Sequence, residues 1–173
     1  MHQKTILGID PGTKEMGLVV LRGRELRYFG VHTLRNGTRP YDVIGQARRI
    51  VLATIEKHQP QVVAIEEPFN LQTKRSNLMK VIADELRGRA EELGLEVVEL
   101  SPVAVRERVT GNERATKIEV AEHLARNGFE QLQQLIPKRP ARAALGLRPG
   151  DKYWLHMFDA LGLAVAVRRT EGS

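Results

Sequence analysis

Hydrophobic and polar residues follow two kinds of pattern along this chain. Short apolar runs bounded by Gly, Pro or acidic residues predict β-strands. These runs cover residues 4–10, 18–23, 25–34, 61–67 and 95–100. Only short turns separate the first three runs, so we expect them to form an antiparallel meander.

Longer segments carry apolar residues three or four positions apart, which is the spacing of one helix face. They cover residues 41–58, 74–93, 102–109, 114–127 and about 152–169. Pro60 ends the first of these helices and Gly94 ends the second. Asp151 is a candidate N-cap for the last helix, and the cations Arg168 and Arg169 suit its C-terminal end.

The order of these elements, β-β-β-α-β-α-β-α-α-α, predicts an α/β fold. We expect a five-stranded mixed sheet, with three antiparallel strands first and two parallel strands after them, and helices on both faces. No repeat or linker divides the sequence. Residues 1–173 are therefore predicted to form a single domain with a substantial core.

Composition narrows the classes of protein to consider. Lys and Arg total 27 against 21 Asp and Glu, and a formal net charge of +6 favours a polyanionic partner such as nucleic acid. The sequence has no Cys, which excludes disulfides, thiolate zinc sites and cysteine nucleophiles. No apolar run is long enough for a membrane span or a signal peptide, so we expect a cytoplasmic protein without membrane contact.

Two acidic residues end predicted strands that lie next to each other. Asp10 ends the first strand and Glu66 ends the fourth. Functional sites of α/β folds lie at such strand ends, and two neighbouring carboxylates there repel unless a cation relieves them. Taken singly, Asp10 is also typical of a turn, and Glu66 of an exposed strand end.

The last helix adds His156 and Asp159, which are three residues apart and share a face. Almost all neighbours of Asp159 are apolar, and a buried carboxylate needs a partner. No Lys or Arg stands one helical turn away, so His156 or a metal ion is the expected partner of Asp159. A histidine on an apolar helix is also compatible with ordinary core packing.

Four motifs, "GIDPGT", "VAIEEPF", "VRERVTGNERATK" and "HMFDALGLAVA", occur in an order and spacing that resemble the RuvC Holliday-junction endonuclease family. The resemblance covers most of residues 4–168. It implies an RNase H-like fold and an endonuclease that cuts branched DNA, above all four-way junctions, in recombination and repair. It also implies a homodimer and a connection with branch-migration motor proteins.

The resemblance implies that two Mg²⁺ or Mn²⁺ ions are bound by Asp10, Glu66, His156 and Asp159. Hydrolysis would then leave 5′-phosphate ends. The family register selects Glu66 rather than Glu67, since adjacent strand residues point to opposite faces. The family usually has an acid where His156 stands, although some relatives have His. The imidazole is open to two roles, as a ligand suited to Mn²⁺ or as a general base.

Further positions are candidates for binding nucleic acid. Phe69 matches a family aromatic thought to work on DNA bases, although packing alone explains it equally well. The other candidates match basic family positions or lie near them and in the basic loop that follows, and a solvated loop is the simpler alternative there. They are Arg106, Arg108, Arg114, Lys117, Lys138, Arg139 and Arg142.

Departures from the family pattern leave other functions open. The segment 74–93 lacks the family's "LGQARG"-like run, and the insertion at 136–151 is longer than in common members. A monomer, or a nuclease acting on flaps, RNA or RNA–DNA, therefore stays possible. Two further classes are an ATPase of the actin and heat-shock chaperone type, whose first strand ends in "GIDxGT", and a nucleic-acid-binding protein without catalysis.

Overall fold

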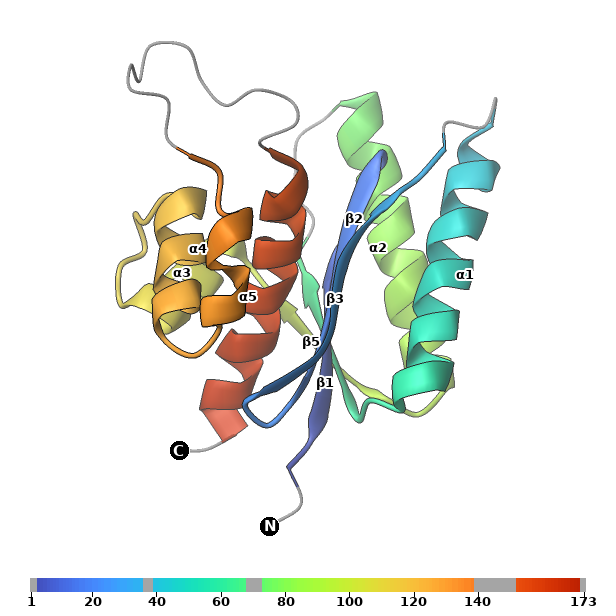
Figure 1. Cartoon of the computed structure of the whole chain (residues 1–173). Coiled ribbons are helices and arrows are strands. Elements are labelled where there is room, and N and C mark those ends of the chain that lie inside the picture. Colours follow the sequence, from blue (N-terminus) through green and yellow to red (C-terminus); the bar gives the residue numbers. More distant parts are fainter. Residues whose placement is uncertain (1–2, 36–38, 68–72, 139–151, 172–173) are drawn as a thin grey trace.

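A computed structural model of the chain describes residues 3–35, 39–67, 73–138 and 152–171. Its five strands form one sheet in the order β3-β2-β1-β4-β5 (Figure 1). The strands are β1 (Thr5–Asp10), β2 (Glu15–Arg22), β3 (Glu25–Thr33), β4 (Val62–Glu66) and β5 (Glu96–Leu100). The first three are antiparallel, whereas β4 pairs parallel with both β1 and β5. The predicted mixed sheet is confirmed.

Helices cover both faces of this sheet, as predicted (Figure 1). One face carries α1 (Pro40–His58) and α2 (Lys74–Glu92). The other carries α3 (Pro102–Thr110), α4 (Lys117–Arg126) and α5 (Tyr153–Glu171). A 3₁₀ helix at Glu130–Leu135 was not predicted, because six residues are too few to show a helical period. Asp151, the predicted N-cap of α5, lies outside the described residues.

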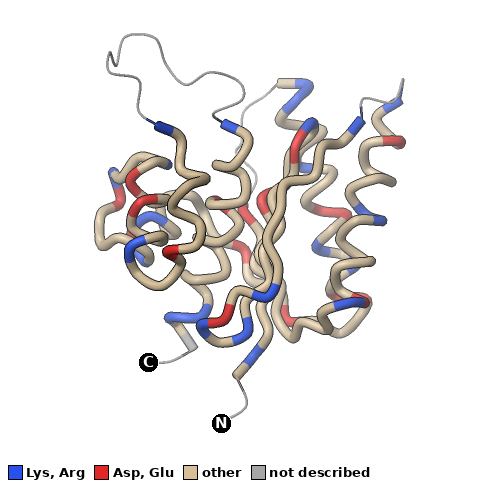
Figure 2. The backbone as a smooth tube through the Cα atoms, in the orientation of Figure 1, with Lys and Arg blue, Asp and Glu red and all other residues tan. Residues whose placement is uncertain are grey.

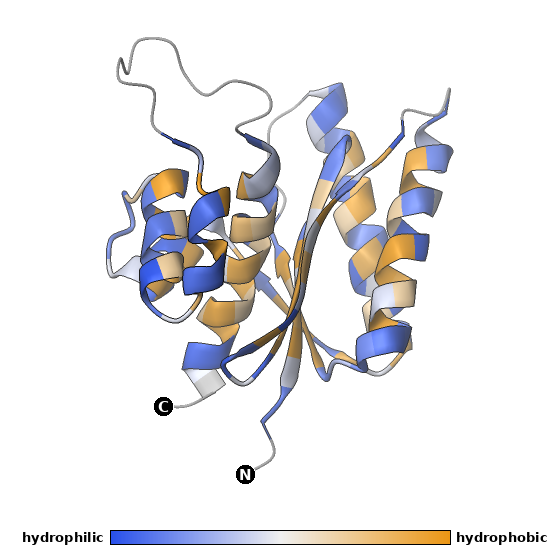
Figure 3. Ribbon diagram, in the orientation of Figure 1, coloured by the Kyte–Doolittle hydropathy of each residue, from blue (hydrophilic) through white to orange (hydrophobic). Residues whose placement is uncertain are grey.

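The core consists of two apolar layers, one on each side of the sheet. In β1, Leu7 and Ile9 pack toward α1 and α2, while Ile6 packs toward α5. Because both faces of β1 are buried, its sequence is a continuous apolar run rather than an alternating one. Figure 3 shows that α5 is apolar along most of its length, yet none of the described helices has the length and apolar character to cross a membrane.

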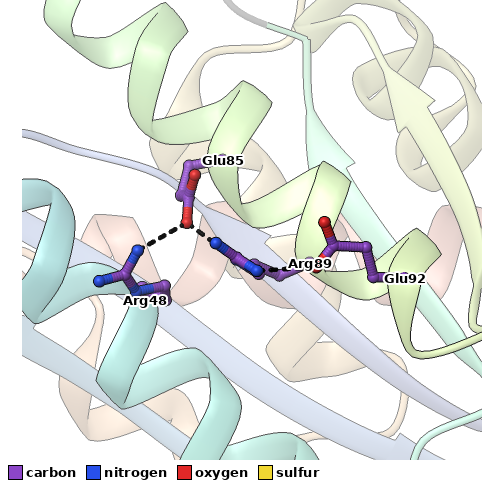
Figure 4. Close-up of polar contacts among 4 residues, drawn as sticks. All are labelled: Arg48, Glu85, Arg89 and Glu92. Atoms are coloured by element: carbon purple, nitrogen blue, oxygen red, sulfur yellow. Dashed lines mark hydrogen bonds and ion pairs between the residues drawn. The ribbon is translucent and has the colours of Figure 1, made fainter.

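A network of charged side chains joins the exposed sides of α1 and α2 (Figure 4). Glu85 of α2 accepts a hydrogen bond from Arg48 of α1 at 3.1 Å and another from Arg89 at 3.0 Å. Arg89 also donates to Glu92 at 2.8 Å. Hydrogen bonds from Arg89 and Arg48 lower the pKa of Glu85. Exposed ion pairs are individually weak, so this network adds modestly to the apolar packing that holds the two helices on the sheet.

Two glycines allow α5 to approach the sheet closely. A Cβ atom at Gly8 of β1 would lie 2.1 Å from the carbonyl oxygen of Ala160. A Cβ atom at Gly17 of β2 would lie 1.9 Å from the carbonyl oxygen of His156. Any other residue would force the helix away from the sheet. The two glycines therefore bring the polar side chains of α5 to the end of β1.

We predict that Gly8→Ala lowers the free energy of unfolding by about 3 kcal/mol, because the added methyl group overlaps a helix backbone that cannot move without disturbing the core. Urea denaturation followed by circular dichroism measures this change. Gly88→Ala is the matched control, since a Cβ atom there meets nothing within 4 Å. The control should raise stability by about 0.5–1 kcal/mol. A Gly8→Ala protein as stable as wild type would contradict the close approach of α5.

Candidate active site

The buried carboxylate of Asp10 stands at the end of β1 and contacts a histidine from α5. Nδ1 of His156 donates to Oδ2 of Asp10 over 2.7 Å. The other ring nitrogen, Nε2, lies 3.3 Å from Oε2 of Glu15, at the start of β2. The hydrogen bond to Asp10 raises the pKa of His156 above its ordinary value, although burial acts in the opposite direction. The imidazole therefore bridges two acidic side chains.

Asp159, one turn further along α5, forms an ion pair with Lys117. The carboxylate side chain is 15% exposed and the lysine side chain 59% exposed, so the pair lies at the mouth of the site. His156 or a metal ion was the expected partner of Asp159, and the structure adds Lys117, which was not considered for this role. The partner comes from α4, 42 residues earlier in the chain. Contacts of this kind cannot be read from helical spacing.

The beginning of α4 directs Lys117 toward the carboxylates. Thr116 caps the helix: its hydroxyl oxygen accepts from the N–H of Glu119, whose side chain accepts from the N–H of Thr116 at 2.7 Å. This capping box starts the helix at Lys117. Burial alone would lower the pKa of Lys117, but the nearby carboxylates, above all Asp159, raise it overall. The ammonium group is therefore charged at neutral pH.

Glu66 completes a group of three carboxyls. Burial raises its pKa to about 8, with further contributions from the negative charges of Asp10 and Asp159. Burial, followed by repulsion from Asp10, likewise raises the pKa of Asp159 to about 6. The neighbouring Glu67 is exposed, and its N–H donates to the carbonyl of Leu100. The register therefore brings Glu66, rather than Glu67, close to Asp10.

This arrangement has the charge and donor atoms that a divalent cation requires. Positive charge stabilises three neighbouring carboxyls, and their oxygens suit hard cations, while His156 offers a nitrogen. Among the described residues, no three Asp, Glu or His side chains converge as ligands of one ion. Protein side chains contact the carboxylates instead: Lys117 forms an ion pair with Asp159, and His156 forms a hydrogen bond with Asp10.

A cavity of about 440 Å³ opens beside the carboxylates, between the start of α2 and helices α3 and α4. Glu66, Lys117 and Asp159 form one part of its lining, and Met79 is among its apolar residues. Arg106 also lines it, and its buried Nε has no hydrogen-bond partner within the part of the chain that is described. An unpaired buried donor is costly, so an acceptor entering this cavity would relieve it.

The remaining predicted residues lie at varying positions around this centre. Arg108 on α3, Arg114 before α4, and Lys138 are exposed. Phe69, Arg139 and Arg142 lie outside the described residues. Glu15 was not predicted, although it lies two residues after the first motif, at the start of β2, which pairs with β1. Lys117 was predicted to contact nucleic acid, and the structure adds its ion pair with Asp159.

Comparison with known proteins gives the family. The family model "Crossover junction endodeoxyribonuclease RuvC" matches residues 6–146. The chain belongs to the RuvC family. RuvC of Bacteroides fragilis is 34% identical over 131 residues, covering 73% of this chain and 70% of that protein. RuvC of Rubrobacter xylanophilus is 33% identical over 183 residues, with coverage of 95% and 84%.

Solved structures show the same fold. The Thermus thermophilus RuvC structure matches with a TM-score of 0.72 at 22% identity, covering 97% of this chain and 96% of that one. The same protein in complex with a Holliday junction substrate matches at 0.71 and 21% identity, covering 98% and 96%. A yeast mitochondrial Holliday junction resolvase matches at 0.64 and 15%, covering 96% and 78%. The predicted RuvC resemblance and RNase H-like fold are confirmed.

The RuvC family, to which this chain belongs, consists of metal-dependent endodeoxyribonucleases. The family match therefore favours the nuclease over the ATPase alternative. The matched range contains Asp10, Glu66 and Lys117, whereas His156 and Asp159 lie beyond it. Their place beside Asp10 comes from the fold itself, through the hydrogen bond of His156 and the ion pair of Asp159 with Lys117.

The raised carboxyl pKa values predict that the metal-free protein loses stability as pH rises. The folded pKa of Glu66, about 8, exceeds its ordinary 4.5. Between these values the folded state therefore binds more protons than the unfolded state, and raising the pH through this window favours unfolding. Asp159 and His156, whose pKa values are also raised, act in the same direction.

Glu66→Gln should therefore raise Tm in EDTA, by little at pH 5 and by most at pH 8–9. Thermal melts across this range measure the difference from wild type. The exposed neighbour provides the control, because Glu67→Gln should leave a curve parallel to wild type. If the curve of Tm against pH for Glu66→Gln were also parallel to that of wild type, the inferred repulsion among the carboxyls would be wrong.

Proposed function

We propose that this protein is a divalent-cation-dependent endonuclease that cuts branched DNA, most of all four-way junctions. The observation that carries the proposal is the position of Asp10, Glu66 and Asp159 at one edge of a RuvC-type sheet, where the nearby charge of Asp10 helps to raise the pKa values of Glu66 and Asp159. The relative from Thermus thermophilus, which matches over nearly the whole chain, was solved in complex with a Holliday junction substrate. Both facts support this substrate class.

We infer that Asp10, Glu66 and Asp159 hold two Mg²⁺ or Mn²⁺ ions through their oxygens, with His156 as the nitrogen donor. When bound, such ions activate a water molecule and stabilise the leaving 3′-oxygen, which yields 5′-phosphate ends. The protein's part is to hold these side chains in one place. Strands β1 and β4 and helix α5 each contribute to the site, so the donors are fixed by buried elements.

Lys117 and His156 have definable tasks in this scheme. Lys117 neutralises Asp159 before cations bind, and its exposed side chain can then turn to a DNA phosphate. His156 gives Nδ1–H to Asp10, and its Nε2, which lies 3.3 Å from Oε2 of Glu15, becomes an acceptor for a cation or for a proton from water once it is deprotonated. Either role requires the neutral imidazole.

We infer that the surrounding cations hold the DNA backbone. Arg106 lines the cavity beside the carboxylates, with Arg108, Arg114 and Lys138 exposed nearby on α3 and after it. Such contacts position a duplex without reading its sequence. The net charge of +6 attracts the DNA polyanion at longer range.

We further propose that two copies act together, because a four-way junction needs two symmetric cuts. Helix α2 is the candidate contact, and its Val81 is 50% exposed. The cytoplasm is the proposed location, and branch-migration motor proteins are the proposed partners.

The proposal predicts cutting of a labelled four-way junction by the wild-type protein with Mg²⁺ or Mn²⁺. Asp10→Asn should lower the single-turnover rate by at least about 100-fold, since it removes an anionic ligand, while junction binding stays within about twofold. Flap, duplex and RNA–DNA substrates run in parallel measure preference. Absence of cutting on every substrate, when a control nuclease cuts, would contradict the enzyme assignment. Retained cutting by Asp10→Asn would exclude that carboxylate.

A further inference from the structure

We propose that a groove on α1 binds the phosphate backbone of a DNA arm that leaves the cutting site. The groove has a volume of about 550 Å³ and is lined by the first half of α1 and by Arg35, which follows β3. It is separate from the carboxylate site, which lies between the sheet and α5. The inference rests on the proposed function, because it assumes that the protein binds branched DNA.

The charge of the groove favours a polyanion. Its lining contains Arg35, Arg48 and Arg49, with Asp42 as the acidic residue among them. Arg48 is engaged by Glu85 of α2 (Figure 4). Within the described part of the chain, no ion pair holds the guanidinium groups of Arg35 or Arg49. These two groups are therefore available to phosphate oxygens, for which guanidinium has suitable geometry.

The shape of the groove comes from one face of α1. Tyr41, Gly45 and Arg49 are four residues apart and therefore share this face. The tyrosine is 82% exposed, and Gly45 leaves the surface between its neighbours without a side chain. A Cβ atom added at Gly45 would lie 3.5 Å from Nη1 of Arg49, which is an ordinary van der Waals contact. We therefore place a sugar–phosphate chain over Gly45, where the residue itself adds no side chain to the surface of the groove.

Arg35 is held in the groove by its backbone. The side-chain amide of Gln46 donates to the carbonyl of Arg35 at 2.9 Å and accepts from its N–H at 3.0 Å. This pair of bonds attaches the segment after β3 to α1. The cationic side chain is therefore presented from a fixed backbone, which limits the entropy lost when it binds a phosphate.

The segment that carries Arg35 is connected to the carboxylate site through Lys14 and Glu15. The N–H of Leu34, next to Arg35, donates to the carbonyl of Lys14 at 2.7 Å. Lys14 precedes Glu15, whose carboxylate lies 3.3 Å from Nε2 of His156. Figure 1 shows that α1, α2 and α5 begin at the same end of the molecule, and Figure 2 shows Lys and Arg recurring there.

This connection favours a DNA arm over an acidic peptide as the occupant. A duplex cut at the carboxylates extends well beyond them, and one of its directions leads over Lys14 to Arg35 and Arg49. A peptide would have no need of a path to the cutting site. The groove therefore extends the DNA contact surface along the edge of the sheet.

Gly45→Glu tests the inference by placing a carboxylate in the groove. The position has room for a side chain, so Gly45→Ala serves as the matched control. Fluorescence anisotropy without divalent cation measures Kd for long-armed four-way junctions over a range of salt. We expect Gly45→Glu to bind about five- to tenfold more weakly, with a salt slope smaller by about 1–2. Gly45→Ala should bind like wild type, and shortening the arms stepwise should abolish the difference.

Arg49→Ala provides a second variant that adds no charge and leaves the helix intact. It should weaken binding about two- to fivefold and lower the salt slope by about 1. If the wild type binds junctions and both variants bind as tightly, the groove inference is wrong while the proposed function stands. If the wild type binds no junction under any salt condition, the proposed function fails and this inference fails with it.

Discussion

Repulsion among three carboxylates is the constraint on which the account of this protein depends. Asp10, Glu66 and Asp159 come from two neighbouring strands and one helix, and burial combined with their mutual repulsion raises the pKa of Glu66 to about 8. Folding brings them together only because Gly8 and Gly17 let α5 lie directly on the sheet. A core that assembles such a cluster accepts a loss of stability, which bound cations recover.

The contacts in the structure show how the chain balances this charge by itself. Lys117 pairs with Asp159, and His156 donates to Asp10. Both partners come from helices packed on the same face of the sheet, so they are present wherever the fold is formed. Cation binding must compete with both contacts. The cation affinity of the site therefore depends on the release of Lys117 from Asp159 and on the protonation state of His156.

The sequence predicts most of this fold because its signals are local. Apolar runs mark the strands, and helical spacing marks the five α-helices of the described residues to within a few positions. Asp10 and Glu66 follow from strand ends. The ion pair of Asp159 with Lys117 could not be predicted, because residues 42 positions apart meet only through the packing of α4 on α5. The groove on α1 was missed for the same reason: its arginines come from α1 and from the segment after β3.

Crystals of the wild-type protein soaked in Mn²⁺ test the central claim most directly, because anomalous scattering locates the ion without reference to activity. The account predicts an anomalous peak within about 2–2.5 Å of oxygens from Asp10, Glu66 and Asp159, with Lys117 turned away from Asp159. The peak should be absent from Asp10→Asn crystals soaked in the same way. A peak only elsewhere, or none at an Mn²⁺ concentration that supports cutting, would contradict the proposed cation site.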